Sequence, residues 1–157
     1  MTCGKRYTYR IMNGRHASAL LRLQHVHVPL PLQAAPMEEA LQTLLGKHDF
    51  AAFQASGGTA KTTVRTIHSA HITQEGDTFT MIVEGDAFLY NMVRIIAGTL
   101  IEIGHGKLGT DAFAQAIATV NRLCLGPTAP AHVLELTKET YPETAFMAPE
   151  AIRWHKE

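Results

Sequence analysis

Hydrophobic and polar residues alternate with a period of two over residues 5–12, where Tyr7, Tyr9 and Ile11 are separated by charged or polar side chains. Such alternation is typical of a strand that buries one face. The same period recurs in residues 21–30, 62–73, 78–85 and 132–141. Two of these segments, residues 62–73 and 78–85, flank Glu75, Gly76 and Asp77, so the pattern predicts a β-hairpin there.

Three other segments have helical spacing. After Pro36, which suits a first helical position, an apolar stripe at residues 37, 40, 41, 44 and 45 predicts a helix with Gly46 as its C-cap. Residues 87–104 are strongly apolar and predict a buried helix. Thr110 and Asp111 predict the start of a third helix that runs through Leu123. Residues 47–53, between the first helix and the hairpin, predict a compact aromatic turn.

The predicted order is strand, strand, helix, hairpin, helix, helix, strand. This order indicates an α+β fold, with a mostly antiparallel sheet and helices packed on one face. We expect one domain over residues 1–141 and a peripheral C-terminal tail over residues 142–157. Because a strand begins almost at the first residue, we also expect that a preceding segment is missing.

The composition narrows the class of protein. The chain has 157 residues, of which 46% are hydrophobic, so it is not intrinsically disordered. Two cysteines, Cys3 and Cys124, exclude a disulfide scaffold in practice, and no apolar run is long enough for a membrane span. We therefore expect a cytoplasmic protein without a membrane partner.

Charge is distributed unevenly along the chain. The net charge is zero, which argues against a strongly basic nucleic-acid binder. However, residues 1–65 carry eight basic and three acidic residues, whereas residues 66–157 carry six basic and eleven acidic ones. The basic half could face a polyanion, or the asymmetry could be ordinary solvated charge.

Nine histidines raise the question of a metal site. His25 and His27 would share one strand face, whereas His68 and His71 would point to opposite faces. Neither pair has a cysteine or carboxylate cluster nearby, so structural or solvent-facing histidines are the preferred interpretation and no metal is expected.

Arg94 and Tyr7 are the strongest candidates for chemistry. Arg94 lies in the apolar segment YNMVRIIAG, and a buried guanidinium requires an anionic or multi-acceptor partner. That partner could be a local carboxylate, a phosphate or a carboxylate from another chain, or Arg94 could simply lie on the polar edge of its helix. Tyr7 is one of two aromatic residues interleaved with basic residues, a pattern found where bases stack, although it also fits a half-buried strand.

Five motifs occur in a fixed order: KRYTYR (5–10), LLGKHDFAAF (44–53), TVRTI (63–67), FLYNMVRIIAGTL (88–100) and NRLCLGPTAPA (121–131). Together they closely resemble the C-terminal half of the bacterial tRNA pseudouridine synthase A family, from Lys5 to about Tyr141. The resemblance implies isomerisation of uridine to pseudouridine in the tRNA anticodon arm (positions 38–40), without metal or organic cofactor. It also implies a tRNA partner and a homodimer.

Site residues follow from the same resemblance. Tyr7 matches the tyrosine that stacks on the target base and assists proton removal, and Arg94 matches the arginine that pairs with the catalytic aspartate. Lys5, Arg6 and Lys61 are weaker candidates for RNA phosphate contact. The essential aspartate of the family lies in an N-terminal R-T-D-x-G-V-H motif, which this chain lacks.

The acids of this chain do not replace that aspartate. Asp49, Asp77, Asp86 and Asp111 all stand in a different sequence context. We therefore expect the chain to be inactive alone and to need the missing N-terminal domain. The alternatives are a non-catalytic RNA-binding or protein-interaction module left from a truncated or split gene and, third, a small metal-binding domain.

Overall fold

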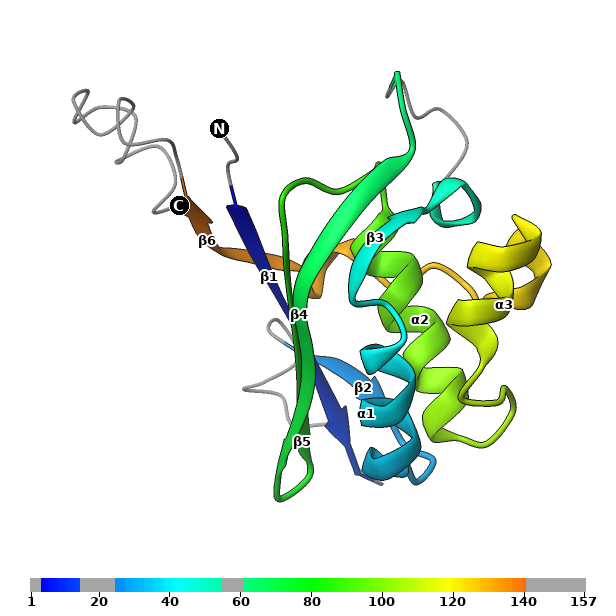
Figure 1. The fold of residues 1–157 in the computed structure, drawn as a ribbon. Coiled ribbons are helices and arrows are strands. Elements are labelled where there is room, and N and C mark those ends of the chain that lie inside the picture. Colours follow the sequence, from blue (N-terminus) through cyan, green and yellow to red (C-terminus); the bar gives the residue numbers. More distant parts are fainter. Residues whose placement is uncertain (1–3, 15–24, 55–60, 141–157) are drawn as a thin grey trace, which may run out of the picture.

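The computed structural model describes residues 4–14, 25–54 and 61–140. One mixed sheet carries three helices on one side (Figure 1). Its strands are β1 (Gly4–Asn13), β2 (Val26–Val28), β3 (Gly46–Asp49), β4 (Val64–Glu75), β5 (Thr78–Gly85) and β6 (Glu135–Thr140). The helices are α1 (Ala34–Gln42), α2 (Met92–Gly104) and α3 (Ala112–Thr119), and short 3-10 turns cover Ala51–Phe53, Arg122–Cys124 and Ala131–Val133. The predicted α+β class is confirmed.

The strand order is β2-β1-β5-β4-β3, and β6 pairs with the first half of β1. Only the β1–β2 pair is parallel, whereas β1–β5, β1–β6, β3–β4 and β4–β5 are antiparallel. The predicted hairpin is present as β4 and β5, with Gly76 at a positive φ of 60° in its turn. β1 therefore lies inside the sheet, bonded on both sides.

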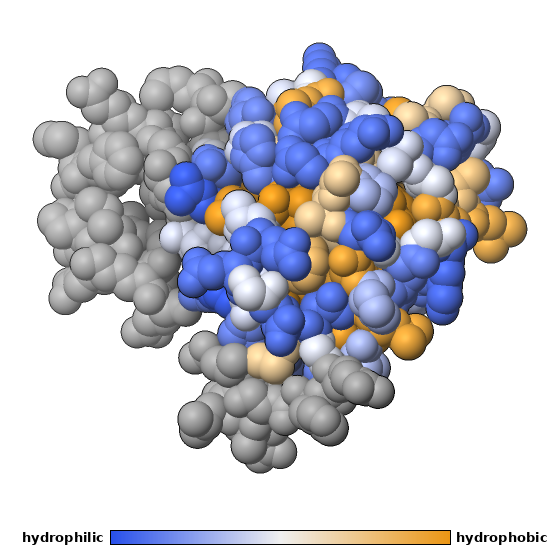
Figure 2. Space-filling view, turned by 90° about the horizontal axis from the view of Figure 1, so that it is seen from below, coloured by the Kyte–Doolittle hydropathy of each residue, from blue (hydrophilic) through white to orange (hydrophobic). Residues whose placement is uncertain are grey.

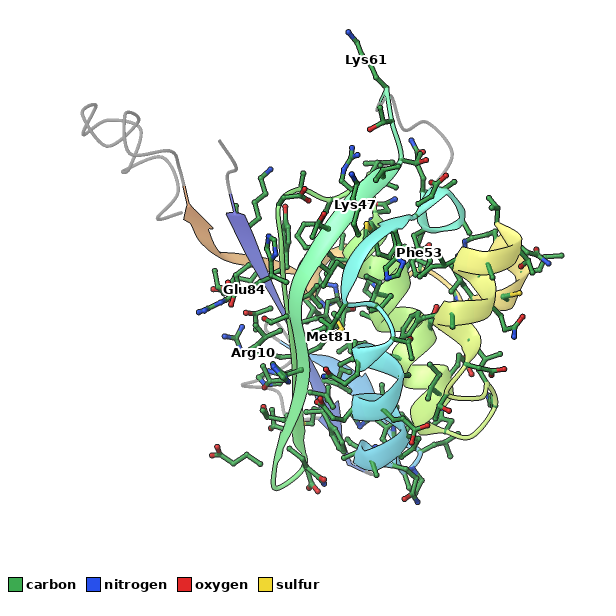
Figure 3. All side chains as sticks on the ribbon, in the orientation of Figure 1. Arg10, Lys47, Phe53, Lys61, Met81 and Glu84 are labelled. Carbon is green, nitrogen blue, oxygen red and sulfur yellow. The ribbon has the colours of Figure 1, made fainter. Side chains whose placement is uncertain are left out.

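Alternation along the central strands separates two faces. Tyr9 and Ile11 of β1, and Phe79, Met81 and Val83 of β5, are buried against the helices. Arg10 and Glu84 project from the opposite side of the sheet, whereas Phe53 lies between the sheet and the helices (Figure 3). On the side away from the helices, Arg6 pairs with Glu84 and Arg10 pairs with Glu135. That face therefore neutralises part of its own charge.

α2 is the central helix, and ten of its residues are buried. A helix that is apolar around most of its circumference must be covered on several sides. α1 packs beside it, and α3 packs against both α1 and the turn Ala51–Phe53. Seen from below, hydrophobic residues still show at the surface between the hydrophilic ones (Figure 2).

The part of β4 that extends beyond β3 has no neighbouring strand on that side among the described residues, and two side chains of α1 bind its backbone instead. Glu38 Oε1 accepts a hydrogen bond from the Ile72 amide at 3.0 Å, and Gln42 Nε2 donates to the Ala70 carbonyl at 2.9 Å. Unpaired backbone groups on an edge strand invite pairing with another chain. These two contacts satisfy part of that edge within the molecule.

Several predicted boundaries were wrong. α1 ends at Gln42 with Thr43 as its C-cap, and Gly46, at φ 100°, instead begins β3, which extends into the region predicted as a turn. α2 begins only at Met92, because Asn91 is left-handed. α3 ends at Thr119, before the left-handed Val120.

The second and last predicted strands are also shorter than expected. Only Val26–Val28 of residues 21–30 is a strand, and residues 21–24 lie outside the described part of the chain. β6 begins at Glu135, because residues 131–133 form a 3-10 turn. The predicted tail over residues 142–157 also lies outside the described residues.

The two histidine pairs lie in different surroundings from each other. His27 donates to the Gly14 carbonyl at 2.7 Å, and His25 is buried. His68 and His71 are both exposed, so the prediction of opposite faces was wrong: the strand register shifts between Ile67 and Ser69. Within the described ranges, no group of three or more metal-ligating side chains comes together.

Candidate functional site

A hollow of about 240 Å³ lies where β1, the start of α2 and the segment before β6 meet. Strand β1 contributes one aromatic residue, and the segment before α2 together with the first turn of α2 contributes most of the wall. The lining residues are Tyr7, Phe88, Leu89, Tyr90, Asn91, Met92, Val93, Arg94 and Leu134. The structure therefore brings Tyr7 and Arg94, the two strongest sequence candidates, to one site.

Tyr7 and Phe88 form the aromatic side of the hollow. Their rings meet edge to face, with centroids 5.3 Å apart and an angle of 85° between the planes. Gly85 makes this approach feasible, since a Cβ there would lie 2.6 Å from the Thr66 carbonyl oxygen and 3.2 Å from the Phe88 ring. Tyr90, on the outer rim, is 58% exposed. Aromatic side chains thus line one side of the hollow.

Arg94 lies in the first turn of α2 and is fixed by two neutral acceptors. Its Nε donates to the Ala129 carbonyl at 2.8 Å, and its Nη1 donates to Asn91 Oδ1 at 2.8 Å. In return, the Ala129 amide donates to the Arg94 carbonyl at 3.0 Å. Helix and loop therefore hold the guanidinium from two sides.

No carboxylate within the described residues forms an ion pair with Arg94. An arginine remains charged at any physiological pH, and a charge removed from water is costly unless it is paired. The carbonyl and amide oxygens satisfy two of the five N–H groups that a guanidinium offers. The site thus presents a positive charge beside an aromatic surface.

The loop that contacts Arg94 is attached to α2 at a second point. The Gly126 amide donates to Thr99 Oγ1 at 2.8 Å, and that buried hydroxyl donates to the Ile95 carbonyl at 2.8 Å. Gly98 faces the loop without a side chain, since a Cβ there would lie 1.7 Å from the Pro127 carbonyl oxygen. The close crossing of residues 126–130 over α2 therefore depends on Gly98.

Tyr9 of β1 contacts the same loop from the sheet. Its ring is fully buried, and its hydroxyl donates to the Pro130 carbonyl at 2.9 Å. Burial raises the pKa of Tyr9 well above its usual value, and the positive charge of Arg94 opposes this rise only in part. Tyr9 thus stays protonated as a donor.

The raised pKa of Tyr9 predicts a loss of stability in alkali. The unfolded tyrosine ionises near pH 10, whereas the folded one retains its proton to higher pH. Above about pH 10 the unfolded state therefore binds fewer protons than the folded state, and the free energy of unfolding falls as the pH rises. We expect Tyr9→Phe to reduce this dependence in urea unfolding measured from pH 8 to 11. An unchanged slope would contradict the assignment to Tyr9.

The remaining sequence candidates lie outside the hollow. Arg6 is paired with Glu84 at 2.9 Å on the opposite face of the sheet. Lys5, at the start of β1, is half-buried, and Lys61 is exposed before β4, at a tip of the molecule (Figure 3). These three residues stay predictions as phosphate contacts.

The four acids that sequence reasoning set aside are also not part of the lining. Asp49 accepts from the Ala51 amide and the Thr63 hydroxyl, and Asp86 accepts from the Thr66 and Ala87 amides. Asp111 precedes α3, and Asp77 lies exposed in the β4–β5 turn. Asp49 and Asp86 thus stabilise turns, and none of the four reaches Arg94.

Sequence reasoning missed three parts of the site. Phe88 and Leu134 gave only an apolar signal, and the loop 126–130 carried no sign of its contact with Arg94. Asn91 and Gly98 are small or polar residues three and four positions from Arg94 in the sequence. Gly98 lies where the loop crosses the helix, and Asn91 contacts the Arg94 side chain.

The comparisons with known proteins place this α+β chain among the pseudouridine synthases. Residues 40–142 match the profile of the family described as tRNA pseudouridine synthase. The chain belongs to the tRNA pseudouridine synthase A family, which confirms the predicted resemblance.

Relatives of that name match most of this chain. The tRNA pseudouridine synthase A of Acetivibrio thermocellus is 46% identical over 138 residues, which cover 88% of this chain and 57% of the relative. The tRNA pseudouridine synthase A 2 of Clostridium perfringens is 46% identical over 132 residues, covering 82% of this chain and 54% of the relative. The Bacillus licheniformis protein is 42% identical over 137 residues, covering 87% and 56%.

The chain thus spans a little over half the length of the curated relatives it matches. Among the described residues, the structure holds no helix that is both long and apolar enough to cross a membrane.

Proposed function

We propose that this chain supplies one side of the active site of a tRNA pseudouridine synthase that converts uridine to pseudouridine in the anticodon arm. The observation that carries the proposal is Arg94, which is anchored in an aromatic hollow and has no carboxylate partner among the described residues. The second side of the site, including the nucleophilic aspartate, comes from the part of the family's sequence that this chain does not match.

The reaction explains why both residue types are needed. The bond between N1 of the base and C1′ of the ribose breaks, the base turns, and a bond forms between C5 and C1′, while C5 loses its proton and N1 gains one. The base must leave the stack before this can happen, so it needs a surface to receive it. Tyr7, supported by Phe88, offers that surface. Arg94 keeps the incoming aspartate ionised and oriented.

The size of the hollow supports a divided site. Small-molecule sites usually enclose about 300–1,000 Å³, and this hollow is smaller and open. A hollow of this volume can provide one wall for a single base. The remaining walls belong, on this proposal, to the missing domain and to the RNA.

The test is release of tritium from tRNA labelled at C5 of uridine. The chain is co-expressed with the portion of the Acetivibrio thermocellus relative that it does not match. We expect release from the assembled pair and none above background from either part alone, since C5 loses its hydrogen only when pseudouridine forms. Turnover by the 157-residue chain alone would overturn the requirement for a second domain.

The alternative function is a non-catalytic RNA-binding module, which the excess of basic residues in positions 1–65 favours. The assembled pair and an anticodon-arm RNA distinguish this alternative from the catalytic function. If the pair shows no turnover, and the chain binds an anticodon-arm RNA with an affinity that Tyr7→Ala and Arg94→Ala leave unchanged, the alternative is supported.

A further inference from the structure

Asn91 has an unusual place at the start of α2. It precedes the first helical residue, Met92, with a left-handed backbone at φ 62° and ψ 8°. An asparagine at this position normally uses its side-chain oxygen to accept a hydrogen bond from a backbone amide in the first helical turn. Asn91 makes no such bond, and its Oδ1 accepts instead from Nη1 of the Arg94 side chain at 2.8 Å.

The contact fixes the orientation of a group that is otherwise held at one point. Ala129 accepts from Nε at 2.8 Å, and the guanidinium could still tilt about this single bond. The second bond, from Nη1 to Asn91, fixes the plane of the group. Two of the five N–H groups are then used, and the three that remain belong to Nη1 and Nη2. These two nitrogens form the edge that binds both oxygens of a carboxylate.

We propose that Asn91 is a positioning residue for the reaction. It orients Arg94 so that the Nη1–Nη2 edge is offered to the aspartate of the missing domain, and because its side chain is neutral it leaves the positive charge of Arg94 uncompensated. The inference rests on the proposed function. It also explains why the side chain forgoes the usual capping bond.

The neutral amide is the specific point of the proposal. An aspartate at position 91 would have nearly the same shape, would tolerate a left-handed backbone, and would begin a helix equally well. However, its carboxylate would lie at the distance of the present amide oxygen and pair with Arg94 inside the chain. It would then compete with the catalytic aspartate for the same guanidinium.

The test compares Asn91→Gly and Asn91→Asp in the assembled pair, by tritium release under saturating and limiting tRNA. Glycine keeps the positive φ and removes the acceptor, so we expect kcat to fall by roughly 10- to 100-fold with KM nearly unchanged. We expect a larger fall for Asn91→Asp. A purely structural role predicts the reverse order, with aspartate equal to the native residue.

Asn121→Asp is the matched control, because Asn121 also precedes a short helix, and its Oδ1 accepts from the Leu123 amide at 3.0 Å, outside the hollow. We expect its activity to equal that of the native chain. Native activity in Asn91→Asp would overturn the proposal.

A second measurement uses the 157-residue chain alone and does not depend on activity. Relaxation of the Arg94 Nε–H group by nuclear magnetic resonance reports how tightly the guanidinium is held. We expect its order parameter to fall in Asn91→Gly and to remain high in Asn91→Asp. An unchanged order parameter in Asn91→Gly would overturn the role of Asn91. Failure of the native pair to release tritium would count against the proposed function, and this measurement would still decide whether Asn91 positions Arg94.

Discussion

Gly98→Ala is expected to lower the free energy of unfolding of this chain by about 3 kcal/mol, although alanine is the better helix former. The new Cβ would lie 1.7 Å from the Pro127 carbonyl oxygen, 2.8 Å from the Pro127 carbonyl carbon and 3.2 Å from the Ala129 nitrogen. All three are backbone atoms, so no side chain can turn away to make room. The loop 126–130 must therefore lift from α2.

Lifting this loop breaks several contacts at once. The Gly126–Thr99 bond and the two bonds between Ala129 and Arg94 would lengthen, each with a net value of about 1 kcal/mol. The buried side chains of Leu125 and Ala129 would be uncovered. The gain of about 1 kcal/mol in helix propensity offsets only part of this loss.

Thermal unfolding followed by circular dichroism measures the effect, with an expected fall in Tm of about 6–12 °C for a chain of this size. Gly104→Ala is the matched control on the same helix. A Cβ there would lie 2.7 Å from Met37 Sδ and 2.8 Å from Leu32 Cδ2, which are the ends of flexible side chains. We expect Gly104→Ala to lower Tm clearly less than Gly98→Ala does. Equal losses in the two variants would contradict the role assigned to the loop crossing.

Much of the fold could be predicted because its strands bury one face. The alternation in β1 and β5 gave both their position and their direction toward the core, and the turn at Gly76 gave the hairpin. The start of α2 could not be predicted in this way. Its apolar pattern continues through residues 87–91, and only the left-handed backbone at Asn91 delays the helix to Met92.

The candidate site was predictable only in part. Arg94 was singled out by a general argument, since a guanidinium among apolar residues needs partners, and the resemblance joined it to Tyr7. The partners that the structure provides, Asn91 and the Ala129 carbonyl, are neutral, and the second lies in a loop 35 residues away in sequence. A backbone carbonyl has no sequence signature, so this contact could be found only from the fold.

Arg94→Met and Arg94→Lys are both expected to lower kcat of the assembled pair by about 1,000-fold or more. Loss of one preorganised donor in an active site typically costs about 100- to 1,000-fold, and Arg94 would offer two donors and a charge to the aspartate. Lysine retains the charge, but its single nitrogen cannot bind the Ala129 carbonyl and Asn91 while it also binds both oxygens of a carboxylate. Charge alone is therefore not sufficient.

The measurement is tritium release in a single turnover, which excludes effects on product release. Arg10→Lys is the matched control, because Arg10 pairs with Glu135 on the side of the sheet away from the helices and lies outside the hollow. It should release tritium at the native rate. If Arg94→Lys also did so, the guanidinium would have no geometric role, and the aspartate of the missing domain would have to be held by other groups. A loss in Arg94→Met that Arg94→Lys largely restores would reduce the role of Arg94 to its charge, and the bonds to Asn91 and Ala129 would then serve only to stabilise the loop.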